Sequence, residues 1–164
     1  MKAAAVSSIV AIALSVQVGL GTRSRNDLVG TWRLVSVFAV DADGQRTEFP
    51  YGTNPDGLIT YTADGRMSAV ISYGGRRPLS GDRVSAPESE RAAAFATSFG
   101  YAGRYEVRGG QVTHHVEVST VQNWVNTDLV RTVVFDANRL TLRTTPTSVG
   151  GTSRTTQLTF ERAK

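Results

Sequence analysis

The sequence predicts an all-β fold, an antiparallel up-and-down β-barrel of about eight strands with one short helix. Apolar and polar residues alternate with a period of two along most of the chain after residue 27, as in strands with one buried face. Short turn sequences separate these segments. The chain has 164 residues, which fits one domain with one core, expected over residues 27–162.

The first 21 residues differ from the rest. Met1-Lys2 is a short positive start, residues 3–20 are mostly apolar, and the small residues Gly19 and Gly21 follow at a spacing that suits cleavage. The segment resembles a signal peptide, and predicts a secreted or periplasmic protein without stable membrane insertion after cleavage. An uncleaved anchor and a cytosolic helix remain alternatives.

Composition excludes several classes of function. The chain contains no cysteine, which excludes disulfides, thiolate metal sites and cysteine nucleophiles. Its net charge is +4, but the basic residues are spread along the chain with no run of five or six, and so lack the cluster that a nucleic-acid-binding face needs. The sequence therefore predicts no nucleic-acid partner, and it leaves the oligomeric state open.

The first half of the barrel is expected to begin with a strand over residues 31–40. Alternation predicts that its inward face carries Trp32, Leu34, Ser36 and Phe38. Two short strands, 58–62 and 66–73, form a hairpin around Asp64-Gly65. The only helix expected after residue 27 spans residues 86–99, with Ser85 as N-cap and Gly100 at its end.

The hairpin of residues 101–108 and 111–119 is the most informative segment. Gly109-Gly110 is a two-residue turn, and such a turn fixes the register of its strands. Tyr105 is then expected to pair with His114, and Tyr101 with Val118. This register points His114 into the barrel and the adjacent His115 out to solvent.

The last two hairpin strands and the final strand complete the predicted barrel. Pairing 128–135 with 140–145 places Arg131 opposite Thr144 on the inward face. The final strand, 154–162, is expected to turn Thr156, Leu158 and Phe160 inward. No Asp or Glu is expected on an inward position. Because a buried cation is unfavourable without a partner, we expect an anionic ligand or water beside Arg131.

Six short motifs in order resemble the lipocalin-like domain proteins of bacteria and fungi, which have calycin-type barrels. They are Gly30-Thr-Trp32-Arg-Leu-Val-Ser36, Tyr61-Thr-Ala-Asp-Gly-Arg-Met-Ser68, Tyr101-Ala-Gly-Arg-Tyr105, His114-His115-Val116, Asn123-Trp124 and Arg131. Gln122 and Asn126 stand where the family commonly has Pro and Gly. The resemblance implies a barrel with an internal pocket. Some members of the family occur in biosynthetic settings, where lipocalin-like barrels can act as isomerases or cyclases.

Several residues are candidates for the pocket. Trp32 is interpreted either as a ligand-stacking wall or as a plug at the barrel base, covered by Arg154 or Arg131. The candidate ligand-binding residues are Trp32, Ser36, Tyr61, Met67, Tyr101, Tyr105, His114, Trp124 and Arg131. No metal site is expected, because the only two histidines diverge, and no cofactor motif is present.

Three functions remain open from the sequence. The first is binding of a small hydrophobic molecule, anionic if Arg131 contacts it. The second is a cofactor-free isomerase or cyclase in which His114, Tyr105 and Arg131 are the candidate catalytic residues. The third is a structural or interaction module whose lumen is filled by its own side chains, which a large cavity would contradict.

Overall fold

The computed structural model describes residues 25–47, 53–149 and 151–164. The signal peptide expected over residues 1–21 lies outside these ranges. Eight strands close into an antiparallel barrel in which β1 pairs with both β3 and β10, so the predicted fold class is confirmed. The barrel strands are β1 (Gly30–Val40), β3 (Asp56–Tyr61), β4 (Arg66–Ser72), β5 (Ser98–Arg108), β6 (Gln111–Ser119), β7 (Asp128–Asp136), β8 (Arg139–Thr144) and β10 (Thr152–Arg162).

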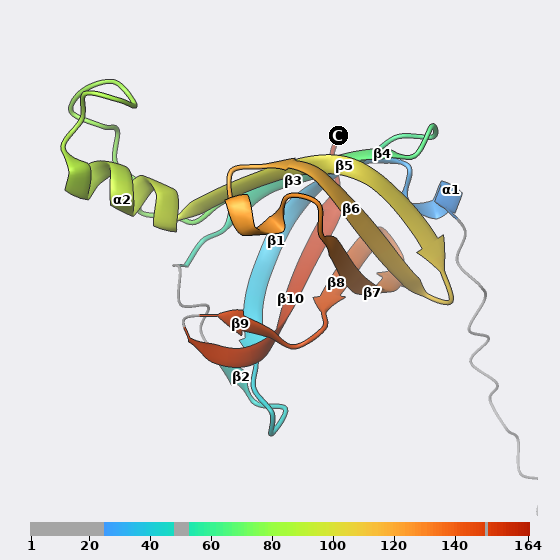
Figure 1. Cartoon of the computed structure of the whole chain (residues 1–164). Helices are drawn as coiled ribbons and strands as arrows, with labels where there is room; N and C mark the ends of the chain where they lie inside the picture. Colours follow the sequence, from blue (N-terminus) through green and yellow to red (C-terminus); the bar gives the residue numbers. More distant parts are fainter. Residues whose placement is uncertain (1–24, 48–52, 150) are drawn as a thin grey trace, which may run out of the picture.

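Short elements extend the barrel at its two ends (Figure 1). Strands β2 (Arg46–Thr47) and β9 (Thr147–Val149) pair with β1 and β10. Helix α1 (Arg25–Leu28) covers one end of the barrel. Helix α2 (Glu88–Ala96) projects beyond the other end, and the 3₁₀-helix η1 (Gln122–Trp124) connects β6 to β7. Within the described ranges, no helix combines the length and the apolar character needed to span a membrane.

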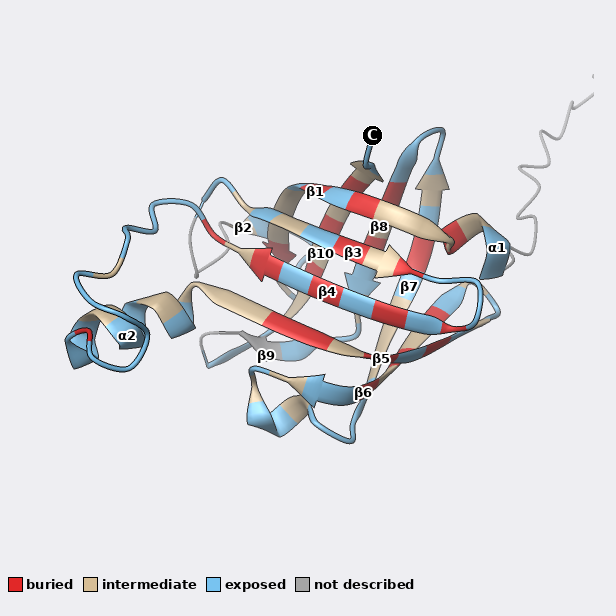
Figure 2. Cartoon of the chain, turned by 90° about the horizontal axis from the view of Figure 1, so that it is seen from above, coloured by how far each residue is buried: buried red, intermediate tan, exposed pale blue. Residues whose placement is uncertain are grey.

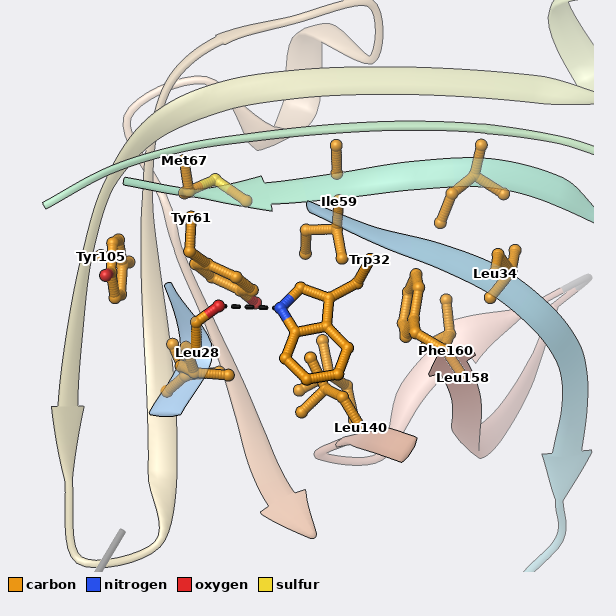
Figure 3. Packing of buried hydrophobic residues seen from close by; sticks show 14 of the residues in the cluster. Leu28, Trp32, Leu34, Ile59, Tyr61, Met67, Tyr105, Leu140, Leu158 and Phe160 are labelled. Carbon is orange, nitrogen blue, oxygen red and sulfur yellow. Dashed lines mark hydrogen bonds between the residues drawn. The ribbon is translucent and has the colours of Figure 1, made fainter. Parts of the chain in front are cut away.

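The lumen at the α1 end is filled with side chains (Figure 3). Trp32 is 2 % exposed and donates its indole N–H to the Leu28 carbonyl at 2.8 Å. The Arg162 guanidinium lies 4.4 Å from the centre of the Trp32 ring. The expectation that Arg154 or Arg131 covers Trp32 is therefore wrong. Arg162 is the cross-strand partner of Trp32, which places its side chain over the ring.

A glycine makes the approach of that arginine possible. A Cβ atom on Gly30 would lie 2.5 Å from Arg162 Nη1, and the same nitrogen donates to the Val29 carbonyl at 2.9 Å. Gly30 also has φ +130°, a conformation that residues with a side chain rarely adopt. The Gly-x-Trp motif therefore gives Arg162 the space to close this end of the barrel.

Burial alternates along the strands, as Figure 2 shows for β4. The registers predicted for the Gly109-Gly110 hairpin near its turn and for β7 with β8 are confirmed: Tyr105 pairs with His114, and Arg131 with Thr144. His114 is completely buried. His115 is half-exposed and its Nδ1 lies 2.7 Å from Asp128 Oδ1, so the two histidines point in opposite directions as expected.

Two bulges overturn parts of the predicted alternation. In β1 the register shifts between Leu34 and Ser36, so Ser36 pairs with the outward Thr159 and Phe38 with Gln157. Both were expected to face inward. In β6 the shift beside Gly103 pairs Tyr101 with Ser119 and leaves Val118 62 % exposed instead of inward. A bulge adds one residue to one strand and reverses the face of every residue beyond it.

The helix is shorter than predicted. It spans Glu88–Ala96, and residues 98–100, expected to end it, belong to β5. Pro87 occupies the N-cap position without a side-chain hydrogen bond. Ser85 belongs instead to the preceding turn, where the Asp82 carboxylate accepts from the Val84 and Ser85 N–H groups.

Candidate functional site

A cavity of about 400 Å³ occupies the barrel at the end away from Trp32. Its volume is within the range of small-molecule pockets and far above that of a few waters. A lumen filled by its own side chains is therefore contradicted for this half of the barrel. The residues that line it are Ile59, Ala69, Ile71, Tyr73, Phe95, Ala96, Ser98, Phe99, Tyr101, Val121, Trp124, Leu129, Arg131, Leu142, Thr144, Thr147, Thr156, Leu158 and Phe160.

One side of the cavity is apolar and aromatic. Phe99 and Trp124 meet edge to face with ring centres 5.2 Å apart, and Tyr101 meets Trp124 in the same way at 5.8 Å. Strand β5 supplies Phe99 and Tyr101, and η1 supplies Trp124. Phe95, at the end of α2, also lines the cavity and is 56 % exposed, so it lies where the cavity opens to solvent.

A second part of the wall, from β7 to β10, carries polar groups. Arg131 lines the cavity, and its cross-strand partner Thr144 does so as well. The Thr144 hydroxyl accepts the Thr156 N–H at 2.9 Å. The cavity therefore has one wall suited to an apolar molecule and a second wall that offers a cation and hydroxyl groups.

Arg131 is a half-buried cation with no ion-pair partner among the described residues. Its Nη1 donates to the Val130 carbonyl at 3.0 Å, and no carboxylate of the described residues lies within 4.0 Å of its guanidinium. Removing a charge from water is unfavourable unless a counter-charge or hydrogen bonds compensate it. Arg131 therefore favours an anionic group in the cavity.

A chain of hydrogen bonds leads from the cavity into the packed half of the barrel. The Tyr101 hydroxyl lies 3.0 Å from His114 Nδ1, and the Tyr61 hydroxyl lies 2.8 Å from His114 Nε2. All three side chains are buried, but only Tyr101 also lines the cavity. The imidazole of His114 is thus held between two phenol groups, behind the cavity wall.

Burial and charge keep His114 neutral. Burial, and after it the nearby positive charge of Arg131, lower the pKa of His114 to about 3. Burial also raises the pKa of Tyr61 well above its ordinary value. Burial raises the pKa of Tyr101 as well, although the charge of Arg131 and its hydrogen bond to the phenol oppose this. At neutral pH these three hydrogen-bonded residues are therefore a neutral imidazole and two neutral phenols.

The residues expected to form the pocket divide into three groups. Tyr101, Trp124 and Arg131 line the cavity. Trp32, Tyr61, Met67, Tyr105 and His114 belong to the packed half of the barrel and are not among the lining residues. Ser36 faces outward beyond the β1 bulge. Tyr105 donates its hydroxyl to the Thr62 carbonyl at 3.0 Å, which anchors it away from the cavity.

Several lining residues were missed by the sequence analysis. Phe95 and Phe99 were placed in one continuous helix, whereas the helix ends between them. Tyr73 follows the end of β4, and Thr147 lies in β9, which was not expected. Thr144 and Thr156 were correctly expected on the inward face but were not named as pocket residues. The alternation of inward and outward residues along their strands was the signal that could have identified them.

The positions of the candidate catalytic residues do not favour the isomerase or cyclase interpretation. Of the three groups that the isomerase or cyclase interpretation needs, only Arg131 contacts the cavity directly, while His114 reaches it through Tyr101. A histidine with a pKa of about 3 is also a weak base at neutral pH. No cluster of three metal-ligating His, Asp or Glu side chains occurs in the part of the chain that the structure describes.

The chain is similar to a known protein family and, at low identity, to solved structures. The family model of the lipocalin-like domain matches residues 29–163. A lipocalin-like protein from Bacteroides uniformis is 15 % identical, with a TM-score of 0.44 over 84 % of this chain and 99 % of that chain. A mutant of the fluorescent protein UnaG is 13 % identical, with a TM-score of 0.38 over 84 % and 97 %. No curated protein sequence matches the chain.

Proposed function

The chain belongs to the lipocalin-like domain family, and from this premise we propose that it binds a small, largely apolar molecule with an anionic end group. One observation carries the proposal. The cavity of about 400 Å³ is apolar and aromatic on one side and holds Arg131, a cation without a carboxylate partner among the described residues, on the other. The apolar part of the ligand packs against Phe99 and Trp124, and its anionic group pairs with Arg131.

The two tryptophans provide a direct test of binding in the cavity. Trp124 lines the cavity, whereas Trp32 is buried in the packed half of the barrel. Dodecanoate, which does not absorb in the range of tryptophan, is titrated into the protein while tryptophan fluorescence is recorded. We expect a saturable change in the wild type that disappears in Trp124→Phe, whose remaining signal comes from Trp32. An unchanged response in Trp124→Phe would place the ligand elsewhere.

The anionic end group is tested with a matched pair of arginine variants. Arg131→Gln removes the cation that lines the cavity, and Arg143→Gln removes an exposed arginine that is held by Gln157 on the outer face of β8. Because hydrogen-bonded charge pairs contribute more than neutral ones, we expect at least about tenfold weaker dodecanoate binding in Arg131→Gln. Arg143→Gln should bind as the wild type does. Equal affinities in both variants would contradict an anion at Arg131.

We also propose that the protein acts outside the cytoplasm. The support is the positive start and apolar stretch of residues 1–21, which precede the barrel domain. The test is expression of the full chain in its host, followed by fractionation and N-terminal sequencing of the product. We expect a shortened chain that begins near residue 22 in the extracytoplasmic fraction. A full-length chain in the cytoplasm would contradict this proposal without affecting the cavity.

A further inference from the structure

The protonation of His114 follows from the two hydroxyls that hold it. A neutral imidazole carries one N–H, so it donates to one partner and accepts from the other. Its Nε2 faces the Tyr61 hydroxyl at 2.8 Å and its Nδ1 faces the Tyr101 hydroxyl at 3.0 Å. The position of the single hydrogen therefore decides which tyrosine donates to His114 and which accepts from it.

Tyr61 settles the direction. It is 1 % exposed and does not line the cavity, and His114 is its one hydrogen-bond partner in the described part of the chain. Donation from Nε2 would leave the Tyr61 hydroxyl hydrogen buried without an acceptor, which native proteins avoid. Tyr61 therefore donates to Nε2, and the imidazole hydrogen lies on Nδ1.

The consequence reaches the cavity through Tyr101. With the hydrogen on Nδ1, the imidazole donates to the Tyr101 oxygen. The hydroxyl hydrogen of Tyr101 is then not donated to His114. Because Tyr101 lines the cavity, this hydrogen is available to a ligand. The cavity wall thus offers two donors, the Tyr101 hydroxyl and the Arg131 guanidinium.

We propose that His114 is a positioning residue that turns the Tyr101 hydroxyl into a donor toward the cavity, so that Tyr101 and Arg131 together select a carboxylate. The proposal rests on the proposed function and adds to it the chemical class of the end group. A carboxylate has only acceptor atoms and meets both donors. An ester with the same hydrocarbon chain has no charge to pair with Arg131, and its carbonyl accepts a weaker hydrogen bond from Tyr101.

The tautomer is measured without any ligand. The chain has two histidines, so His115→Gln, a substitution on the outer face, leaves His114 as the only imidazole. Two-bond ¹H–¹⁵N spectra of the labelled protein distinguish a protonated from an unprotonated ring nitrogen. We expect a protonated Nδ1 and an unprotonated Nε2 at neutral pH. The opposite tautomer, or a doubly protonated ring, would overturn the proposal.

Selection is measured as the ratio of affinities for dodecanoate and its methyl ester. We expect a preference for dodecanoate that falls about tenfold in Tyr101→Phe, because a hydrogen bond to a charged group is lost. Tyr105→Phe is the control, since that hydroxyl donates to the Thr62 carbonyl outside the cavity. His114→Asn places an amide N–H near the Nδ1 position and should keep the preference. His114→Gln lacks a donor there and should lose it.

The outcomes separate the two proposals. An equal preference in the wild type and Tyr101→Phe overturns the role of Tyr101, and binding of both compounds without preference overturns carboxylate selection; the proposed binding cavity survives both. Binding of neither compound by the wild type overturns the proposed function for apolar anions and this inference with it. If the His114 variants do not fold, the tautomer measurement and Tyr101→Phe still decide the proposal.

Discussion

The two ends of the barrel are built from the same strands, but they differ in whether their polar side chains find partners within the protein. At the α1 end, Trp32 donates to the Leu28 carbonyl and Arg162 donates to the Val29 carbonyl, so polar atoms are satisfied within the chain. At the cavity end, Arg131 has no carboxylate partner within the described ranges, and the barrel remains hollow. Side-chain packing thus concentrates stability at one end, and the other end keeps groups that a ligand can satisfy.

The largest expected contrast between the two ends concerns the tryptophans. Trp32→Ala empties a fully packed site and should lower the free energy of unfolding by about 3–5 kcal/mol. Trp124→Ala enlarges a cavity that already exists and should cost about 1 kcal/mol. Urea denaturation followed by circular dichroism measures both. Equal losses would show that the cavity end carries as much stability as the packed end.

A second contrast is between the two histidines and uses pH. The folded-state pKa of His114 is about 3, below the ordinary 6.5, so the unfolded chain binds this proton more readily. The stability that His114 contributes is complete above pH 6.5 and is lost as the pH falls toward 3. The slope approaches about 1.4 kcal/mol per pH unit.

Denaturation midpoints between pH 7 and pH 4 test this dependence on His114. His114→Gln should show a flatter decline than the wild type, because the variant has no imidazole to protonate. His115→Gln is the matched control, because it removes an imidazole from the outer face and leaves His114 in place. A wild-type slope in His114→Gln would mean that other groups control the acid sensitivity.

The smallest expected contrast concerns the two arginines. Arg162→Met removes the cation over Trp32 and its hydrogen bonds to backbone carbonyls, and should cost about 1 kcal/mol. Arg131→Met removes a half-buried charge that lacks an ion-pair partner among the described residues, so the ligand-free protein should change by less than about 0.5 kcal/mol or become more stable. Thermal unfolding of the ligand-free variants ranks them. A larger loss in Arg131→Met would assign that residue a structural role.

The sequence was sufficient where a short turn sets the register. The turn at Gly109-Gly110 correctly placed His114 inward and His115 outward, and the next hairpin placed Arg131 on the inward face. Alternation failed at the bulges, because an extra residue such as Val35 carries no distinctive residue pattern. Ser36 was misplaced for this reason.

The cavity itself could be predicted only in part. Tyr101 and Arg131 follow from alternation, but Phe95 and Phe99 depend on where the helix ends, which local sequence specifies poorly. The boundary between the packed and hollow halves depends on side-chain volumes contributed by all eight strands. For that reason Tyr61, Met67 and Tyr105 were expected at the ligand but belong to the packed half.

The pairing of β1 with β10 closes the barrel by joining its first strand to its last. These strands come from opposite ends of the described sequence, and Arg162 connects the last strand to the carbonyls of Asp27 and Val29. During folding, β1 and β8 therefore present unpaired edges until Thr152–Arg162 joins them. A folding intermediate in which β10 is not yet paired is an open sheet prone to association with other strands, and the pairing of β10 with both edges is the event that closes the barrel.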